Sequence, residues 1–474
     1  MRLYLLALNP TDSVTEGFLP AAARLGLTVT VLTEPGYVAA HREAYRAAVA
    51  PAGLGAVPEI NGCAVRDFRE VVGEISRRRA ADGPFAVFSN SDHLQTQAAL
   101  AAAYFGLPGK DWRATLRAKD KAETRRHLAA AGLDTVRSAE LAPEADADAE
   151  ADADVTFVPV PVPVHGADSV SAAVPVPRAS VSLPGPAPYS APASKTGSAP
   201  QARPAFDPAA FGVGYPCVVK PREGVASEDV VLVGDAAELR QRVAAIRARR
   251  PGQALVVEEF LPGELRTLET LGDAAGTRHV LGGFRTRLSP PPYFIEERLY
   301  FEPESPGFRR PGADQVLAQL DALGVGFGVC HTEYVTGPDG RARIIEVNYR
   351  AIGDQCDLML ADLLGIPLFE HILRTHLGEP LPRSLNARTD GRARQDAPLA
   401  DRSGTLTAAP GPAELTVDGT RLTYRPLRAV GEYRELTHTN RDYLGILRVT
   451  GTDEAAVDRV ATGFLAAQRW EITP

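Results

Sequence analysis

The stretch HTEYVTGPDGRARIIEVNYR, residues 331–350, is the most informative part of this sequence. β-branched and aromatic residues lie on both sides of a Pro-Asp pair, which indicates two β-strands joined by a tight turn. If Gly337 pairs with Gly340, the register of the hairpin places Glu333 opposite Ile344. This register decides which side chains lie together.

Side chains alternate along a strand, so the hairpin gathers polar groups on one face. That face holds His331, Glu333, Glu346 and Asn348. The other face, with Ile345 and Val347, should belong to the core. Two carboxylates and an amide oxygen in close reach repel unless a cation neutralises them, and such oxygen ligands suit Mg²⁺ completed by water and phosphate. A solvated polar strand face is the alternative.

A second informative stretch is YPCVVKPREGVASEDVVLV, residues 215–233. The 51 basic residues of the chain include only five lysines, and one of them, Lys220, ends a strand just before a turn. Lysine carries a compact ammonium group whereas arginine carries a wide fork, so Lys220 predicts a narrow anionic pocket. The turn holds Gly224 and Ser227, and its backbone N–H groups can cradle phosphate oxygens. A surface lysine beside a charged hairpin turn is the alternative.

A third stretch, VVEEFLPGEL at 256–265, ends a hydrophobic strand in the run Glu258, Glu259, Phe260 and Leu261. Backbone groups exposed where a strand gives way to a loop can hydrogen-bond the edge of a planar base. The carboxylate of Glu264 follows shortly afterwards, where it can accept hydrogen bonds from ribose hydroxyls. The three stretches together predict a metal–nucleotide site.

The overall composition excludes several classes of function. The chain has 474 residues, 45% hydrophobic and 23% charged, as expected of about two to four globular domains. Its net charge of -8 and the lack of a basic block argue against nucleic acid and anionic membranes as partners. The apolar run at the N-terminus is too short for a signal peptide or a membrane span. Four widely spaced cysteines fit a reduced compartment, so we expect a cytoplasmic protein.

Shifts in composition predict the domain organisation. A βαβ start indicates a doubly wound N-terminal α/β domain, and its polar loop 89–93 follows a strand at the edge where such sheets bind ligands. Tracts rich in Ala, Pro and Asp cannot bury enough apolar surface to fold, although VTFVPVPVPV within them could form an edge strand. We therefore expect an N-terminal domain at 1–114, a helix at 115–140, a disordered linker at 141–205, a small α+β lid at 206–262, a larger metal and substrate subdomain at 263–383, a loop at 384–411 and a C-terminal α/β cap at 412–474.

Taken in order, these motifs resemble the ATP-grasp superfamily. The most specific pieces are HTEYVTGPDGRARIIEVNYRAIGD at 331–354 and VEEFLPGE at 257–264, and the resemblance runs from Leu116 to Pro382 apart from the linker. The resemblance implies an α/β fold of the ATP-grasp type. Within the superfamily the chain is most similar to carboxylate–amine ligases of the amino-acid-ligase type, including enzymes of siderophore and peptide natural-product pathways.

The resemblance also implies roles for particular residues. Phosphates or base would meet Lys121 and Lys220, with Lys119 as the alternative to Lys121, and the flap would contribute Gly224 and Ser227. Adenine would lie against Glu258, Glu259, Phe260 and Leu261, and ribose against Glu264. One or two Mg²⁺ ions, or Mn²⁺, would bind Glu333, Glu346 and Asn348. Arg350 and Lys220 would be catalytic, and Phe294, Glu296 and Arg350 would face the substrates.

The implied reaction joins a small carboxylic acid to an amine. The carboxylate attacks the γ-phosphate of ATP to give an acyl-phosphate and ADP, and the amine then displaces phosphate to form an amide. An amino or hydroxy acid of a siderophore or dipeptide pathway is the expected acid, and a homodimer is compatible with the family. The alternatives are a non-catalytic nucleotide-binding module and a phosphotransferase that stops at a phosphorylated product.

The flap departs from the family pattern. Ala226 and Asp229 stand where the family usually has glycine. Alanine costs little there if its φ stays negative. An inward Asp229 would repel phosphate, so we expect either that it points outward or that the flap closes differently.

Overall fold

The computed structural model describes residues 1–49, 57–141, 208–305, 308 and 310–474. The predicted linker at 141–205, with the edge strand considered inside it, lies outside these residues except for Leu141. None of the helices in the described ranges combines the length and apolarity needed to cross a bilayer.

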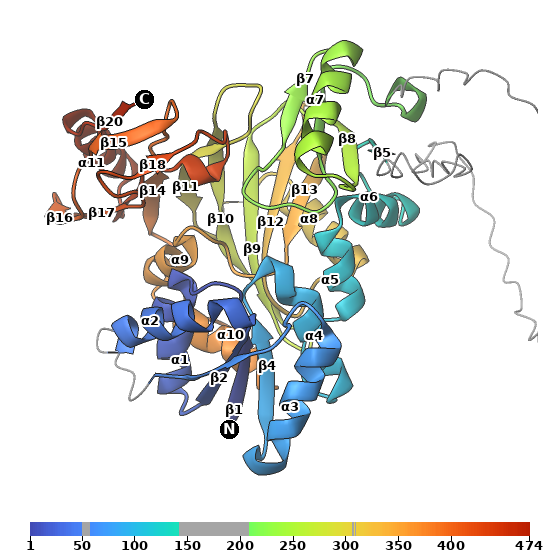
Figure 1. Ribbon diagram of the computed structural model, residues 1–474, viewed down its shortest axis with the longest axis vertical. Coiled ribbons are helices and arrows are strands. Elements are labelled where there is room, and N and C mark those ends of the chain that lie inside the picture. Colours follow the sequence, from blue (N-terminus) through green and yellow to red (C-terminus); the bar gives the residue numbers. More distant parts are fainter. Residues whose placement is uncertain (50–56, 142–207, 306–307, 309) are drawn as a thin grey trace, which may run out of the picture.

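The N-terminal domain is the expected doubly wound layer, at the bottom of Figure 1. Its parallel four-stranded sheet has the order β3-β2-β1-β4. The strands are β1 (Arg2–Leu6), β2 (Thr28–Thr33), β3 (Glu59–Gly62) and β4 (Phe85–Ser89). The helices are η1 (Ser13–Phe18), α1 (Leu19–Arg24), η2 (Pro35–Tyr37), α2 (Val38–Val49), α3 (Phe68–Asp82), η3 (Asp92–Leu94) and α4 (Gln95–Tyr104). The loop after β4 therefore opens at the carboxyl edge of the sheet, as predicted.

The helix expected at 115–140 is two helices and a strand. Helix α5 (Trp112–Lys119) ends at Asp120, whose extended backbone starts α6 (Lys121–Ala130). The Asp120 carboxylate accepts hydrogen bonds from two backbone N–H groups of the first turn of α6, so it is an N-cap. The apolar periodicity continues across this break, which is why the sequence predicted one helix. The break makes Lys121 the first residue of α6.

The lid is an antiparallel sheet of order β5-β8-β6-β7. Its elements are β5 (Ser138–Leu141), η4 (Pro208–Phe211), β6 (Cys217–Pro221), β7 (Val231–Val233), α7 (Ala236–Arg249) and β8 (Leu255–Glu259). Because β5 precedes the linker and pairs with β8, the lid begins before residue 206, the boundary expected from composition.

A nine-stranded sheet forms the centre of the molecule, in the order β13-β12-β9-β10-β11-β14-β19-β17-β16. Its strands are β9 (Leu265–Gly272), β10 (Arg278–Leu288), β11 (Glu296–Glu302), β12 (Gly328–Thr336), β13 (Ala342–Asn348), β14 (Arg392–Asp396), β16 (Ala413–Val417), β17 (Thr420–Pro426) and β19 (Gly445–Gly451). Helices α8 (Ala313–Leu323), α9 (Cys356–Leu364), α10 (Leu368–His376) and α11 (Glu454–Ala467) cover it. A small sheet of β18 (Tyr433–Arg434), β15 (Gly404–Ala408) and β20 (Glu471–Thr473) completes the cap, with η5 (Asn440–Asp442) beside it.

The expectation of a loop at 384–411 is wrong, because β14 lies there and joins β11 to β19. Its sequence RARQD shows no apolar alternation, so it did not read as a strand. Burial of this polar strand depends on ion pairs from Asp396 to Arg394 at 2.7 Å and to Arg298 at 2.6 Å. The cap is thus an extension of the central sheet.

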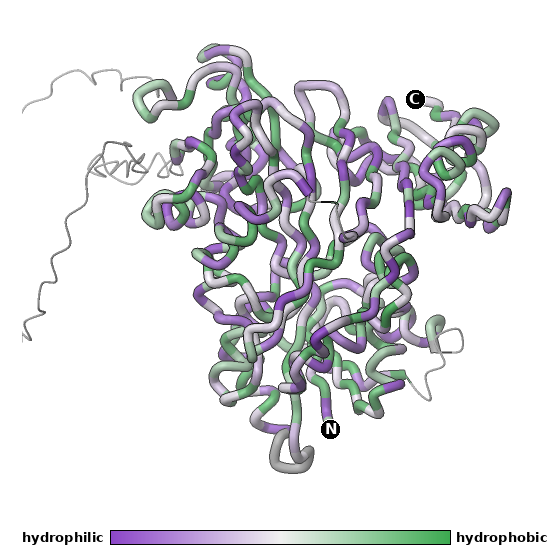
Figure 2. Tube along the Cα trace, turned by 180° about the vertical axis from the view of Figure 1, so that it is seen from behind, coloured by the Kyte–Doolittle hydropathy of each residue, from purple (hydrophilic) through white to green (hydrophobic). Residues whose placement is uncertain are grey.

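Helices α9 and α10 connect the N-terminal domain to the central sheet. One hydrophobic cluster holds Phe18 and Phe88 of the N-terminal domain, Phe369 of α10 and Phe284 of β10. Figure 1 shows the N-terminal domain, the lid and the cap around this sheet, and the reverse view in Figure 2 shows the N- and C-termini at opposite ends of the molecule. The carboxyl edge of the N-terminal sheet therefore faces the same region as the lid.

Candidate nucleotide and metal site

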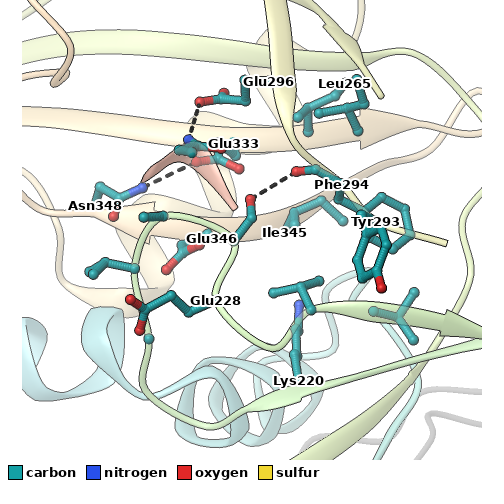
Figure 3. A pocket seen from close by; sticks show the side chains of 18 of the residues that line it. Lys220, Glu228, Leu265, Tyr293, Phe294, Glu296, Glu333, Ile345, Glu346 and Asn348 are labelled. Carbon is teal, nitrogen blue, oxygen red and sulfur yellow. Dashed lines mark hydrogen bonds between the residues drawn. The ribbon is translucent and has the colours of Figure 1, made fainter. Parts of the chain in front are cut away.

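A cavity of about 730 Å³ lies where the lid sheet, the β12–β13 hairpin and the loop 222–230 meet; we call this loop the flap. Every site residue predicted from the sequence lines the cavity except Glu264. Figure 3 shows Glu333, Glu346 and Asn348 from the hairpin across the cavity from Lys220 of the lid.

Glu264 lies outside the cavity, so the structure does not support its predicted ribose contact. Its neighbours Gly263 and Leu265 line the cavity, and alternation at the start of β9 directs Glu264 to the other side. There its carboxylate pairs with Arg266 at 2.7 Å. The sequence spacing located the segment but not the direction of this side chain.

The β12–β13 hairpin has a different register from the predicted one. The turn is a three-residue loop, 338–340, closed by a backbone hydrogen bond from Gly337 N to Arg341 O of 3.0 Å, with Gly340 at φ 72°. This loop shifts the pairing by one residue, so that Tyr334 rather than Glu333 lies opposite Ile344.

A β-bulge then shifts the pairing by one more residue, and Glu333 lies opposite Glu346. The two shifts add up to two residues, so each side chain stays on its predicted face of the hairpin. The predicted polar face is therefore present, although the predicted pairing was wrong. Ile345 was expected in the core but lines the cavity, because the bulge leaves it without a partner. Val347 is buried as expected.

The polar face offers oxygen ligands. Glu333 and Glu346 are opposite each other, and Asn348 Nδ2 donates to Glu333 Oε1 at 3.3 Å, so all three groups converge. Within the described residues no three His, Cys, Asp or Glu side chains cluster as a metal site. Two carboxylates and an amide oxygen fit Mg²⁺, which takes its remaining ligands from water and phosphate.

The carboxylate of Glu258 is held between two cations rather than open to a base. Glu258 is 2% exposed, and it pairs with Lys220 Nζ at 2.6 Å and Arg125 Nε at 3.0 Å. Burial alone would raise the pKa of Glu258, but Arg125 and Lys220 outweigh it and lower the pKa to about 2. Glu258 therefore stays ionised, and its predicted contact with adenine could involve only its backbone.

Arg125 is a site residue that sequence reasoning missed. The signal was present, because Arg125 follows Lys121 by one helical turn and so lies on the same face of α6. Lys121 Nζ pairs with Glu346 Oε1 at 2.9 Å, which favours Lys121 over Lys119 at the cavity. Lys119 pairs instead with Glu223 at 2.9 Å.

These ion pairs gather cations beside the carboxylates of the hairpin. Lys121, Lys220 and Arg125 are buried and pair with Glu258 and Glu346, and, against the effect of burial, Lys121 also contributes to the lowered pKa of Glu333. Burial lowers the pKa of Lys220, Glu258 opposes that effect, and the other two cations add to it. A phosphate group in the cavity could accept hydrogen bonds from Lys121 and Lys220, which line it.

Arg350 connects the cavity to the N-terminal domain. Its Nε donates to Asp92 Oδ2 at 2.6 Å, and the backbone N–H of Ala351 donates to Asn90 Oδ1 at 3.0 Å. The polar loop 89–93, a candidate wall of the site from its position after β4, therefore fixes the segment that carries Arg350.

Comparison with known proteins supports the assignment of the fold. Residues 213–358, from the lid to the start of α9, match the family model of the ATP-grasp domain. This chain has the ATP-grasp fold. It superposes on the L-amino acid ligase from Bacillus licheniformis with a TM-score of 0.66 and 20% identity, covering 100% of this chain and 99% of that one. Phosphoribosylglycinamide synthetase from Anaerococcus prevotii gives 0.61 and 13% identity, with coverage of 100% and 99%.

A curated relative is more similar in sequence. The uncharacterized protein y4rH of Sinorhizobium fredii (strain NBRC 101917 / NGR234) is 26% identical over 279 residues, which are 55% of this chain and 54% of that protein. The chain thus spans about half the length of that relative.

The flap of this ATP-grasp fold is strained. Ala226, Ser227 and Asp229 have φ angles of 58°, 57° and 57°, in the left-handed region that glycine tolerates best. The condition under which alanine would cost little at position 226, a negative φ, is therefore not met. Asp229 points away from the cavity to Arg249 and Arg250 of the lid, at 2.6 and 2.9 Å, so it does not face phosphate.

Replacing Ala226 with glycine is expected to stabilise the protein. The left-handed conformation costs alanine about 1–2 kcal/mol, and the added chain entropy of glycine offsets about 0.5–1 kcal/mol of the gain. We expect the free energy of unfolding in urea to rise by about 0.5–1 kcal/mol. Ala244→Gly, at an exposed position within α7, should instead lower the free energy of unfolding by about 1 kcal/mol. If both substitutions change the free energy of unfolding in the same direction, Ala226 is not strained.

The far end of the cavity is crowded with carboxylates. Glu296 of β11 faces Glu333 and Asp354, and burial together with these two charges raises the pKa of Glu296 to about 8. Asn440 Nδ2 donates to Glu296 Oε2 at 3.3 Å. Phe294 lines the same end, and its carbonyl accepts from Ser227 Oγ at 2.8 Å. A cationic group bound here would lower the pKa of Glu296 and pair with its ionised carboxylate.

Asp354, Asn440 and Arg441 line the cavity and were not predicted. Asp354 is the last residue of the motif quoted at 331–354, so its position after Gly353 was a usable signal. Asn440 and Arg441 lie in the cap, about 140 residues from the segment they approach, and no local pattern marks them.

Proposed function

We propose that this chain is an ATP- and Mg²⁺-dependent carboxylate–amine ligase that forms an amide through an acyl-phosphate. The observation that carries the proposal is the pairing of Glu333 with Glu346 beside Asn348, across from the buried lysines Lys121 and Lys220, in a cavity of the ATP-grasp fold. A metal–triphosphate complex matches this site, because its metal would bind the carboxylates and its phosphates would pair with the lysines.

The nucleotide would lie between the lid and the hairpin. Phe260, Leu261 and Ile345 supply apolar walls for adenine, and the backbone at the end of β8, 258–261, supplies hydrogen bonds to its edge. Lys220 lies where the phosphate chain would pass beneath the flap. Gly224 and Ser227 cover that chain from the flap.

Glu333, Glu346 and Asn348 would hold one or two Mg²⁺ ions, which would supply neutralisation of charge on the phosphates. Lys121, which pairs with Glu346 beside this site, would be placed to bind a phosphate oxygen. Arg350, oriented by Asp92, would contact the transferring phosphoryl group and stabilise its developing charge. The chain supplies positioning and charge, and no side-chain nucleophile is required.

The acid would be a small amino or hydroxy acid, and the amine would bind as a cation at Glu296, beside Phe294. In Glu296→Gln we expect the KM for the amine to rise about tenfold or more because a charge-assisted hydrogen bond is lost, while the KM for ATP stays unchanged. Glu297→Gln is the matched control, since the next side chain along β11 pairs with Arg287. Equal KM values for the amine in both variants would contradict this role.

Phosphate release from ATP tests the reaction. The purified protein with Mg²⁺, ATP and pools of carboxylic acids and amines, including amino acids, polyamines and citrate-like acids, should release free phosphate, and mass spectrometry should detect an amide. A siderophore or dipeptide pathway is the expected context. Phosphate that stays bound to a product would indicate a phosphotransferase, and tight ATP binding without turnover would indicate a binding module. The outward Asp229 weakens the argument for that module, which rested on an acidic flap.

A further inference from the structure

A loop of the C-terminal cap, residues 437–443, reaches the site from the side opposite the lid; we call it the cap loop. It is held rigid by its own hydrogen bonds. Asp442 accepts from the backbone N–H of Thr437 at 3.0 Å and of Thr439 at 3.2 Å, and Thr439 caps the short helix η5. A loop fixed in this way presents Asn440 and Arg441 in one orientation.

The cap loop contacts the flap at two points. The backbone N–H of Asn440 donates to Ala226 O at 3.3 Å, and Arg441 Nη2 pairs with Glu228 Oε1 at 2.6 Å. Glu228 also pairs with Arg250 of the lid at 2.6 Å. The Glu228 carboxylate therefore lies between a cation of the lid and a cation of the cap.

The same loop contacts the segment that carries Glu296. Asn440 Nδ2 donates to Glu296 Oε2 at 3.3 Å, and Tyr443 Oη donates to the Glu296 carbonyl at 2.8 Å. The ring of His438 stacks on Tyr293, with 4.2 Å between ring centroids and 5° between planes. Asn440 thus touches the flap with its backbone and Glu296 with its side chain.

We infer that Asn440 and Arg441 are positioning residues that tie the carboxylate of Glu296 to the flap over the nucleotide. Asn440 orients Glu296, and Arg441 holds Glu228 and with it the closed flap. An occupant at Glu296 and a nucleotide under the flap would then each favour the same arrangement, and such coupling is reciprocal. That the occupant is an amine rests on the proposed function, whereas the tie to the flap does not.

Hydrogen exchange of the flap amides 222–230, with and without MgADP, tests the Arg441 contact without any need for turnover. Arg441 is 63% exposed, so we expect a moderate effect. In Arg441→Gln the Kd for MgADP should rise about two- to fivefold, and flap exchange in the complex should accelerate by a similar factor. Arg441→Lys, which keeps the charge, should bring both the Kd for MgADP and the rate of flap exchange close to the wild-type values. Arg434→Gln, which removes a cap arginine that pairs with Glu432 and Leu427 of the cap in the described part of the chain, should match the wild type.

Separate measurement of KM for the amine and of kcat tests the Asn440 contact. Asn440→Ala should raise the KM for the amine about tenfold with a smaller change in kcat, because Glu296 loses its donor. Asn440→Asp has the same shape but loses the Nδ2 donor, and its added charge would raise the pKa of Glu296 further and leave less of the ionised carboxylate, so it should be at least as impaired as Asn440→Ala. An Asn440→Asp variant that behaves like the wild type would show that Asn440 only fills space, and would overturn its positioning role.

The two proposals fail separately. If flap exchange and MgADP affinity in Arg441→Gln equal those in Arg434→Gln, the tie between cap and flap is wrong, whatever the reaction. If flap exchange responds as expected and no amine is ever joined, the tie stands and the ligase assignment fails.

Discussion

Glu346→Gln is expected to lower the release of phosphate from ATP by about 100- to 1,000-fold, the effect of removing one group that stabilises charge at a reacting centre. Glu346 is opposite Glu333 in the register and is the partner of Lys121, so the substitution removes a carboxylate from the predicted metal ligands and changes the charge beside the phosphates. Glutamine has nearly the same shape and can still accept from Lys121, so the fold should persist. A coupled assay of phosphate release against ATP and Mg²⁺ concentration measures both kcat and the apparent affinity for Mg²⁺.

Glu414→Gln is the control for that experiment. Glu414 lies on β16, at the edge of the central sheet, where its exposed carboxylate pairs with Arg421 at 2.9 Å. It should show wild-type turnover. Turnover of Glu346→Gln within threefold of this control, with an unchanged dependence on Mg²⁺, would contradict the assignment of the polar face of β12–β13 as the metal site.

Glu258→Gln is expected to give the largest loss of stability. Its carboxylate neutralises two buried cations, Lys220 and Arg125, so removing the charge leaves both without compensation. Breaking a buried ion pair in this way costs about 3–5 kcal/mol. We expect the free energy of unfolding in urea to fall by that amount, with the lid unfolding first if the transition is not two-state.

The neighbouring Glu259→Gln provides the matched control. Glu259 pairs with Arg137, whose side chain is 53% exposed, and such pairs contribute about 0–1 kcal/mol. Equal losses in the two variants would show that Glu258 does not carry the buried charge balance.

The pH dependence of stability follows from the same carboxylate. The pKa of Glu258 falls from 4.5 to about 2 in the folded protein, so its contribution to stability is full above pH 4.5 and is lost as the pH falls through the folded pKa near 2. The wild type should therefore lose stability between these values relative to Glu258→Gln, and the two curves should converge at the acidic end. Urea unfolding at several pH values measures this difference.

The hairpin 331–350 shows which features of the site could be predicted from local sequence. Strand alternation predicted that Glu333, Glu346 and Asn348 share a face, and they do, although the loop at 338–340 and the bulge at Ile345 each moved the pairing by one residue. Because side chains alternate with a period of two residues, two one-residue shifts return each side chain to its original face. The pairing itself depends on where backbone irregularities occur, and the core packing of both strands decides that.

Sequence by itself, through its resemblance to the ATP-grasp superfamily, predicted the fold and a set of candidate site residues of which all but Glu264 line the cavity, because the motifs that carry them lie within short segments. Tertiary structure alone decided which charges meet. Glu258, Lys220 and Arg125 come from three separate segments, and the direction of Glu264 follows from the start of β9. The contact of Asn440 with Glu296 spans 144 residues. An ion pair or hydrogen bond across such separations leaves no periodicity in the sequence, since its geometry arises only when the elements pack.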